Sequence, residues 1–574
     1  MCFKKNADNG KIKKIVCLTE KITAYKLAEF EITVEGAVGN AFDPDSLRLD
    51  FTYSAPDGKT RTHPCFIYRK VNIDENGVYT LDPAAEPVWR ARITPTLQGR
   101  YSGEIALFEN NAETGKISFD FSAAEAEDTR GFIGVEKSLH KAFQFENGEI
   151  FTPIGQNVCW GEKINWKERT SPETLDMHRR IFEKMHMFKA NWSRIWLSAE
   201  WDLGFFGKNS RTDDFSSVLN RAARLDDLMK IMEENEIYSV MVFYYHGMFN
   251  DGGANTAWEY NAFNAKNPHG YLENPGDFFT NPRCIKEAKQ YLRYITARYG
   301  YSRNIFTWEL FNEVNFTDGD PDAIRAWHHE MTEFLRKTDA HPHMVTTSSS
   351  VNRYPLIFDD IFDYINMHRY GDPGNVKMIA HEAYLAFHDF DRPIMMEESG
   401  YDAYHPFTHY VARHCQLWAG LMANTPATAM EWFWEEWDLY TNGTDDIYYS
   451  YRDFAPAADF AALIPRADPH QRFVSRERLA LNHPRADVLG YNGVDYAYLW
   501  IYDSCYTVKN PEPVKITDVT MELFLENGEY LIRWFDTYTG TFFKTERTEI
   551  KGRFIRIAPP EFTKDIALAI EKIK

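Results

Sequence analysis

The chain has 574 residues, of which 44% are hydrophobic and 15% aromatic, so it can bury several cores and is not a disordered protein. Its formal net charge of −20 disfavours nucleic acid or an anionic membrane as a partner, because both attract basic surfaces. The seven scattered cysteines include no C-x-x-C pair, which predicts neither a disulfide framework nor a zinc site.

The beginning of the chain has no pattern typical of export. Residues 1–27 contain lysines but no continuous apolar segment, and no stretch approaches the ~18 apolar residues of a membrane span. We therefore expect a cytoplasmic protein without a membrane partner. A homo-oligomer is left open.

Residues 18–123 alternate between apolar and polar side chains with a period of two, which indicates β-strands with one buried face. The clearest stretches are 30–36, 47–54, 89–96, 101–108 and 116–123. They predict an immunoglobulin-like β-sandwich over residues 1–125, and the polar stretch 124–131 is a natural domain boundary.

The pattern then changes to short apolar runs that alternate with long helical periodicities. The runs are 151–157, 191–198, 238–247, 305–313, 343–350, 363–370, 392–399 and 427–434. Helices are expected at 171–190, opening on Ser171 as N-cap, and at 220–236, 282–300, 322–337 and 407–424. Eight such units predict an α/β fold, a (β/α)₈ TIM barrel over residues 126–465. An open doubly wound sheet is the alternative, but the Gly-rich phosphate loop typical of it is missing.

The strand pattern returns near the end of the chain. Stretches at 495–503, 519–525, 530–536, 541–550 and 553–560 are separated by turn sequences. They predict a second, smaller β-sandwich over residues 466–574.

In a TIM barrel the chemistry lies at the C-terminal ends of the strands, so polar residues that close the apolar runs are candidates for the site. A chain often leaves a core at a polar residue, and this explains one or two of these positions. A set of polar residues that converge on one place instead favours a functional site. The candidates are Asn157, Trp160, Arg194, His246, Asn312, Glu313, His368, Tyr370, Glu397 or Glu398, Trp432 and Trp434.

Two of these strand ends carry specific motifs. "NIFTWELFNEV" resembles the fourth barrel strand of a large clan of retaining (β/α)₈ glycoside hydrolases, which includes cellulases and mannanases of the family-5 type. The resemblance implies that Glu313 is the general acid/base and that Asn312 binds the sugar 2-hydroxyl. "RPIMMEESG" resembles strand seven, in which Pro393 and Gly400 frame the nucleophile, here Glu398.

The resemblance extends over the whole middle of the chain. It implies substrate-binding roles for the arginine of strand two, the histidine ending strand three, the His-x-Tyr of strand six and a tryptophan of strand eight; these are Arg194, His246, His368, Tyr370 and Trp432 or Trp434. Residues 31–105 are also similar to the β-sandwich that precedes such barrels in bacterial cellulase-like proteins. Residues 130–157 resemble that family's entry into the barrel, and 528–540 resemble its small trailing β-domain.

The two adjacent glutamates need a separate argument. Side chains alternate across a strand, so Glu397 and Glu398 are expected to point to opposite faces, one to the barrel axis and one to the helix layer. Periodicity leaves open which one faces the axis, and only the Pro393–Gly400 match selects Glu398.

Together these features predict a retaining β-glycoside hydrolase that cleaves β-linked oligo- or polysaccharides without a cofactor or a metal. Glycoside cleavage needs one protonated and one ionised carboxyl group, and a separation near ~5 Å implies retention whereas ~6.5–9.5 Å implies inversion. Arg194 and Tyr370 are expected to keep Glu398 ionised. The alternatives are a non-catalytic carbohydrate-binding barrel and a transglycosylase.

Overall fold

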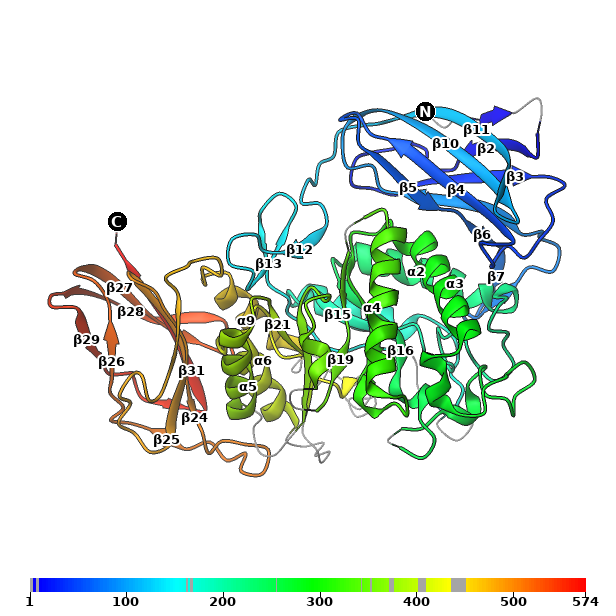
Figure 1. Ribbon diagram of the computed structural model, residues 1–574. Coiled ribbons are helices and arrows are strands. Elements are labelled where there is room, and N and C mark those ends of the chain that lie inside the picture. The colour runs from blue at the N-terminus through cyan, green and yellow to red at the C-terminus, as the bar shows by residue number, and fades with distance from the viewer. Residues whose placement is uncertain are drawn as a thin grey trace.

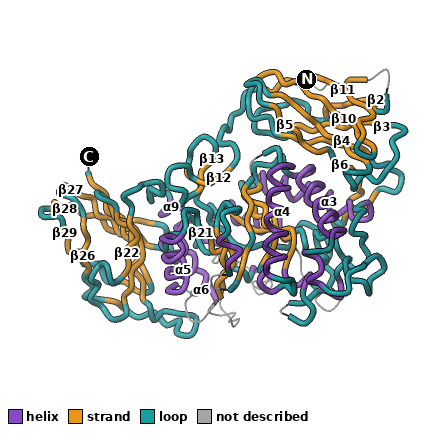
Figure 2. The backbone as a smooth tube through the Cα atoms, in the orientation of Figure 1, coloured by secondary structure: helices purple, strands orange, loops and turns teal. Residues whose placement is uncertain are grey.

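The computed structural model describes residues 4–6, 10–161, 164–165, 169–253, 255–341, 343–351, 354–370, 376–400, 409–434 and 451–573. Antiparallel sheets lie at the two ends of the molecule, and parallel strands with helices lie between them (Figures 1 and 2). The sequence therefore folds as a mixed α/β protein, in the order that the hydrophobic periodicity predicted.

The N-terminal part contains two main antiparallel sheets. One has the order β1 (Lys4–Asn6), β2 (Ile12–Cys17), β3 (Ala28–Val34), β9 (Val88–Ile93), β6 (Phe66–Tyr68). The other has the order β11 (Ala112–Ala123), β10 (Gly99–Glu109), β4 (Leu47–Ser54), β5 (Thr60–Pro64), and a hairpin joins β7 (Val71–Ile73) to β8 (Tyr79–Leu81). Phe30 of one sheet lies 5.6 Å from Phe51 of the other, so their apolar faces share a core.

The central part contains the parallel strands. After a small antiparallel sheet of β12 (Ile133–Val135), β13 (Phe143–Phe145) and β14 (Ile150–Phe151), four strands run parallel: β15 (Trp192–Trp196), β16 (Tyr238–Tyr245), β17 (Ile305–Asn312) and β18 (Met344–Thr346). A second parallel sheet follows: β19 (Ser348–Ser349), β20 (Ile365–Tyr370) and β21 (Ile394–Gly400). Every residue of β16, β17 and β21 is buried, as expected for strands covered on both faces.

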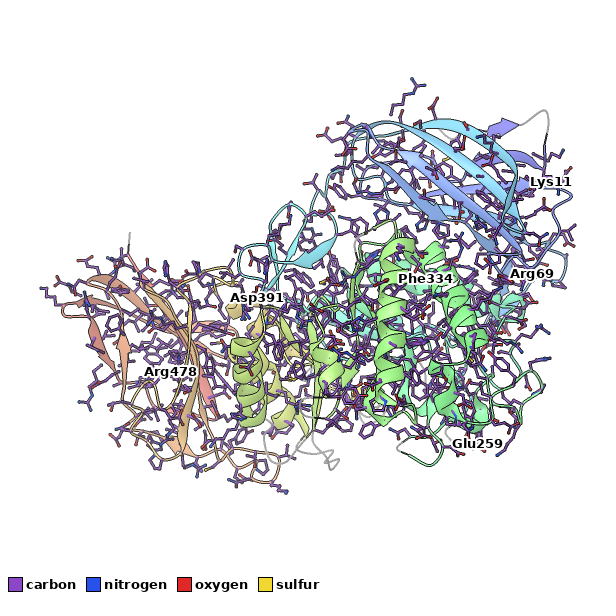
Figure 3. The ribbon with its side chains drawn as sticks, in the orientation of Figure 1. Lys11, Arg69, Glu259, Phe334, Asp391 and Arg478 are labelled. Atoms are coloured by element: carbon purple, nitrogen blue, oxygen red, sulfur yellow. The ribbon has the colours of Figure 1, made fainter. Side chains whose placement is uncertain are left out.

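Helices alternate with these strands and cover them. They are α1 (Asp176–Met187), α2 (Leu219–Glu234), α3 (Pro282–Tyr299), α4 (Pro321–Thr338), α5 (Val376–Asp389), α6 (His409–Met422) and α9 (Phe454–Ala461). Single 3₁₀ turns are η1 (Ser216–Val218), η2 (His246–Phe249), η3 (Trp258–Tyr260), η4 (Pro275–Phe279), η5 (Val314–Phe316) and η6 (Pro355–Phe358). Asn281 and Asp320 cap α3 and α4 just before a proline, which defines both starts. Figure 3 shows Phe334 on the α4 helix.

The first of the predicted helices begins later than expected. Ser171 is not its N-cap, because the Ser171 hydroxyl donates to the carbonyl of Trp201 and α1 starts only at Asp176. Glu173 has a φ of 57°, a left-handed conformation that cannot continue a right-handed helix. The motif "SPE" therefore forms part of the loop ahead of the helix.

The first and last apolar runs of the central part, 151–157 and 427–434, form isolated bridges instead of long strands. Gly155 bridges Trp192, and Gln156 and Ser399 each bridge Glu431, all in parallel. Pro153 has no N–H to donate and only accepts, from Thr428. These two segments thus connect β15 on one side to β21 on the other.

The C-terminal part is antiparallel again. Its main sheet has the order β22 (Arg472–Ser475), β23 (Ala486–Asn492), β24 (Tyr496–Asp503), β31 (Asp565–Lys572), β27 (Gly528–Asp536), β28 (Thr541–Ile550). Two short pairs, β25 (Lys515–Ile516) with β30 (Phe562–Thr563) and β26 (Met521–Phe524) with β29 (Phe554–Ile557), accompany it.

A buried histidine joins this sheet to the central helices. His414 of α6 lies 3.1 Å from Asp565 of β31 and stacks on Tyr538 with ring centroids 4.0 Å apart. Burial alone would lower the pKa of His414, but Asp565 and Asp453 raise it to about 10.

In the part of the chain that the structure describes, no helix combines the length and apolar character needed to cross a bilayer.

Candidate active site

Strand β17 leads into an acidic residue with an unusual backbone. Glu313 follows the strand with φ 50° and ψ 50°, in the left-handed region that is uncommon for residues other than glycine. Its N–H donates to the hydroxyl of Ser348 at 2.9 Å, which helps to hold this conformation. The sharp exit turns the Glu313 side chain inward, and the residue is only 8% exposed.

Two histidines flank the Glu313 carboxylate. Nδ1 of His368 lies 3.1 Å from one oxygen, and Nδ1 of His246 lies 3.6 Å from the other. Asn312, the preceding residue, contacts His246 at 3.5 Å and accepts a hydrogen bond from Arg194 at 2.9 Å. Strands β16, β17 and β20 therefore bring their polar ends to one place.

Strand β21 brings a second carboxylate to the same place. Arg194 donates to one oxygen of Glu398 at 2.7 Å, and the Tyr370 hydroxyl donates to the other at 2.8 Å. His368 lies 3.3 Å from the latter oxygen. Both contacts that the sequence predicted for Glu398, with Arg194 and with Tyr370, are present.

The charges around Glu398 favour its ionised form. Burial alone would raise the pKa of Glu398, but His368 and Arg194 lower it to about 2 through their charges and hydrogen bonds. Burial would likewise lower the pKa of His368, but Glu398 and Glu313 raise it to about 9. His368 is thus a cation between two acids at neutral pH.

The two carboxyl groups lie close together. One oxygen of Glu313, one oxygen of Glu398 and a ring nitrogen of His368 all lie within 4.8 Å of one another. This is also a spacing at which three side chains can hold a metal ion. In this structure the three side chains contact one another directly, with Nδ1 of His368 3.1 Å from Glu313 and 3.3 Å from Glu398.

The predicted opposite orientation of the two adjacent glutamates is wrong. Strand β21 pairs Met396 with Met367 and then Glu398 with His368, so Glu397 is an extra residue at a β-bulge. A bulge interrupts the alternation of side chains. Both acids therefore point to the interior, and each contacts the guanidinium of Arg194.

Glu397 has a different environment from its neighbour. Its oxygens accept hydrogen bonds of 2.6 Å from Tyr364 and from Asn366, whereas its distance to Arg194 is 3.8 Å. Burial and the nearby charge of Glu309 raise the pKa of Glu397 to about 8. Glu397 is accordingly a neutral buried acid near pH 7, in contrast to Glu398.

The sequence reasoning missed one acid of this network, Glu309. It lies in the middle of β17, is fully buried and accepts from Arg194 at 2.8 and 3.2 Å. A charged residue inside the apolar run "IFTWELF" was the available signal. Such a residue needs a buried partner of opposite charge.

Of the other predicted residues, Asn157, Trp160 and Trp434 are buried, and Trp432 is partly exposed. Asn157 is completely buried, and its amide donates to the backbone carbonyls of Glu397 and Glu431, so it holds strands together. Trp434 is 1% exposed and donates to the carbonyl of Trp160, itself buried. Trp432 packs edge-on against both rings and remains half-buried.

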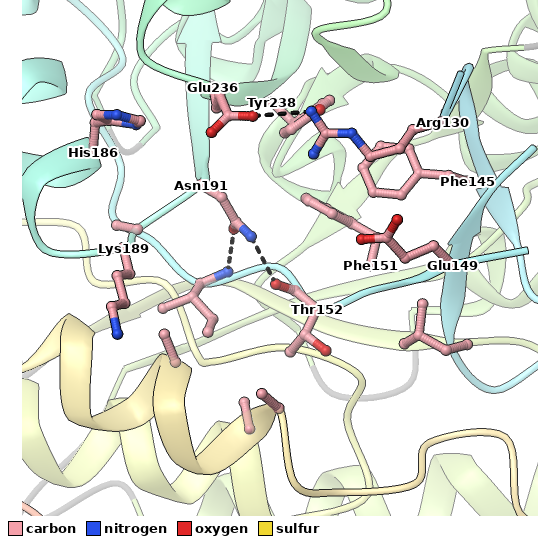
Figure 4. Close-up of a pocket in the computed structure, with 16 residues that line it drawn as sticks. Arg130, Phe145, Glu149, Phe151, Thr152, His186, Lys189, Asn191, Glu236 and Tyr238 are labelled. Atoms are coloured by element: carbon pink, nitrogen blue, oxygen red, sulfur yellow. Dashed lines mark hydrogen bonds and ion pairs between the residues drawn. The ribbon is translucent and has the colours of Figure 1, made fainter. Parts of the chain in front are cut away.

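A separate cavity of about 410 Å³ lies at the opposite ends of the parallel strands (Figure 4). Tyr238, the first residue of β16, and Asn191, just before β15, line it together with Arg130, which pairs with Glu236 at 2.9 Å. The Asn191 side chain bonds the backbone at Thr152 and Ile154, as the dashed lines show. The polar side chains that line this cavity therefore bond the surrounding structure, and the cavity lies away from Glu313 and Glu398.

Comparisons with known proteins find relatives among the glycoside hydrolases. No protein-family profile matches the chain. The probable mannan endo-1,4-beta-mannosidase A of Aspergillus clavatus is 24% identical over 269 residues, which are 41% of this chain and 69% of that protein. The mannan endo-1,4-beta-mannosidase A of Aspergillus aculeatus is 24% identical over 212 residues, 31% of this chain and 53% of that protein.

The sequence is thus similar to mannanases, which supports a cellulase- or mannanase-like glycoside hydrolase. This confirms the relationship that the strand motifs predicted. The match spans about half the length of the Aspergillus aculeatus relative.

Solved structures of glycoside hydrolases share the fold. A candidate glycoside hydrolase from Bacteroides vulgatus superposes with a TM-score of 0.59 at 15% identity, covering 97% of this chain and 100% of that one. A family 5 glycoside hydrolase from the same species gives a TM-score of 0.50 at 12% identity and covers 77% and 93%. At these identities the likeness concerns the fold alone.

Proposed function

We propose that the protein is a retaining β-glycoside hydrolase in which Glu398 is the nucleophile and Glu313 is the general acid/base. The observation that carries the proposal is that one oxygen of Glu313 and one oxygen of Glu398 lie within 4.8 Å of each other. Two acids about 5 Å apart suit a double displacement, whereas about 6.5–9.5 Å leaves room for the water of an inverting enzyme.

In the first step the Glu398 carboxylate attacks the anomeric carbon while Glu313 gives its proton to the departing glycosidic oxygen. The bond to the leaving group breaks as the ester bond to Glu398 forms, so the sugar becomes covalently attached. The environment of Glu398, with Arg194 at 2.7 Å and Tyr370 at 2.8 Å, supports its role as the ionised partner.

In the second step Glu313, now ionised, takes a proton from water, and the hydroxide oxygen attacks the anomeric carbon and releases Glu398. Two inversions give net retention. We assign to Asn312 the contact with the sugar 2-hydroxyl, because it is held beside both acids by Arg194 and His246. The reaction as written requires no cofactor.

The proposed architecture is a (β/α)₈ barrel over residues 126–465 with β-sandwiches at 1–125 and 466–574. The parallel order β15 to β18 and β19 to β21 supports it. The bridges from 155–156 and 431 to the neighbouring strands support closure between the first and last units. Candidate acids at the C-terminal strand ends fit the usual place of chemistry in such barrels.

We propose β-linked mannose polymers and oligomers as the first substrates to examine, because both Aspergillus relatives are named mannan endo-1,4-beta-mannosidases. Of the two strand-eight tryptophans, Trp432 is the one proposed to stack on a sugar ring. It is half-buried, whereas Trp434 is 1% exposed and its N–H is already used by Trp160.

The test is hydrolysis of manno-, gluco-, galacto- and xylo-configured β-oligosaccharides and aryl β-glycosides, with the product anomer followed by ¹H NMR. We expect retention, and losses in kcat of at least ~100-fold for Glu313→Gln and for Glu398→Gln. Binding without hydrolysis in the wild-type protein would instead identify a carbohydrate-binding barrel. Inverted product, or full activity of either variant, would overturn the assignment.

A further inference from the structure

Arg194 is surrounded by more carboxyl groups than its single positive charge can neutralise. Its guanidinium is completely buried and lies 2.7 Å from Glu398, 2.8 Å from Glu309 and 3.8 Å from Glu397. Three carboxylates around one cation would leave two uncompensated charges in a dry interior. The His368 cation lies 3.3 Å from Glu398, but Glu313 shares it at 3.1 Å. At least one of the three acids is therefore expected to be protonated.

Geometry selects the neutral acid. Glu397 is the farthest of the three from the guanidinium, and its oxygens are instead bonded by the uncharged groups of Tyr364 and Asn366. Glu309 and Glu398 make the short, charge-assisted contacts. Arg194 thus forms two ion pairs, one with the proposed nucleophile and one with Glu309.

We propose that Glu309 is a positioning residue that aims Arg194 at the nucleophile; this inference rests on the proposed function. Nε and one terminal nitrogen of Arg194 both donate to a single oxygen of Glu309, at 3.2 and 2.8 Å. This two-point contact defines the plane and rotation of the guanidinium.

The remaining donors of Arg194 then point to the site. The other terminal nitrogen donates to Glu398 at 2.7 Å and to Asn157 at 3.2 Å. The nitrogen shared with Glu309 also donates to Asn312 at 2.9 Å. The guanidinium of Arg194 therefore positions both the attacking oxygen of Glu398 and the Asn312 amide proposed to bind the 2-hydroxyl. Glu309 in turn positions the guanidinium.

A purely structural role for Glu309 predicts different behaviour. A structural defect lowers the fraction of folded, reactive protein, whereas a positioning defect lowers the rate at which every folded molecule forms the glycosyl-enzyme. The two acids beside Arg194 provide a matched pair of substitutions. Glu309→Gln removes a charge that contacts Arg194, and Glu397→Gln replaces a group that is already neutral with one of the same shape.

The experiment measures glycosyl-enzyme formation with a 2-deoxy-2-fluoro glycosyl fluoride of the sugar that the wild-type protein hydrolyses, followed by intact mass. For Glu309→Gln we expect the labelling rate constant to fall at least ~10-fold, with about one label per chain at the end. Turnover of a dinitrophenyl glycoside, which needs no proton from Glu313, should fall equally. Glu397→Gln should label within ~3-fold of wild type.

Three results separate the possibilities. A wild-type protein that is neither labelled nor active refutes the proposed function itself. An active wild type together with a Glu309→Gln variant that labels at the normal rate, or that labels slowly only because its final stoichiometry is low, overturns the positioning role. If Glu309→Gln does not fold, Glu309→Asp, which keeps the charge but withdraws it by one methylene, is judged by the same rate and stoichiometry.

Discussion

The most direct consequence of the two adjacent acids concerns the pH dependence of stability. Glu397→Gln preserves the size of a fully buried side chain and can still bond Tyr364 and Asn366. It removes only the ability to ionise. We therefore expect the variant to be somewhat less stable than the wild-type protein at low pH, because its hydrogen bonds are weaker. As the pH rises, its stability relative to the wild-type protein should increase.

The magnitude follows from linkage. The pKa of Glu397 is raised from its ordinary 4.5 to about 8, so between these values the unfolded chain ionises Glu397 and the folded protein does not. The stability that Glu397 contributes to the folded protein is fully present below pH 4.5 and is lost as the pH rises towards 8. Each pH unit in the window costs the wild-type protein up to ~1.4 kcal/mol, or about 4 kcal/mol from pH 5 to pH 8.

The measurement is the thermal midpoint of wild-type protein and of Glu397→Gln at half-unit steps from pH 5 to pH 9. The difference between variant and wild type should move in favour of the variant up to about pH 8 and then level off. Parallel midpoints for wild type and Glu397→Gln across the range would refute the neutral buried acid.

Three further outcomes follow from the contacts. Tyr370→Phe removes a hydrogen bond to the ionised form of Glu398, so kcat should fall ~10-fold and the acidic limb of the pH–rate profile should move to higher pH. Trp432→Ala should raise KM at least ~10-fold with little change in the thermal midpoint, whereas Trp434→Ala, at a buried position, should lower the midpoint by destabilising the core by about 3–5 kcal/mol. His414→Ala should destabilise the attachment of the C-terminal sheet most strongly below pH 6.5, where the raised pKa of His414 contributes fully, and less as the pH approaches 10; equal destabilisation at all pH values would contradict this.

Much of the fold could be read from periodicity, because burial on one face imposes a period of two on strands and of about 3.6 on helices. The prediction for 47–54 coincides with β4, and 541–550 coincides with β28. Predictions failed where a single residue changed the backbone. Glu173 adopts a left-handed conformation ahead of α1, and Pro153 interrupts the first strand of the central part.

The sequence by itself predicted which acids meet in the candidate site. The motifs ending in Glu313 and Glu398 resemble two strands of glycoside hydrolases and thereby singled out this pair, and the structure brings the two acids together. Arg194 and Tyr370 were likewise expected beside Glu398, and both contact it.

Only the tertiary structure decided how the acids share their surroundings. Alternation placed Glu397 and Glu398 on opposite faces, but a β-bulge, which depends on pairing with β20, turns both inward. The spacing of Glu313 from Glu398, the neutral state of Glu397 and the part played by Glu309 all arise from groups distant in sequence that meet around Arg194. Protonation in a dry interior depends on such neighbours, and local sequence does not specify them.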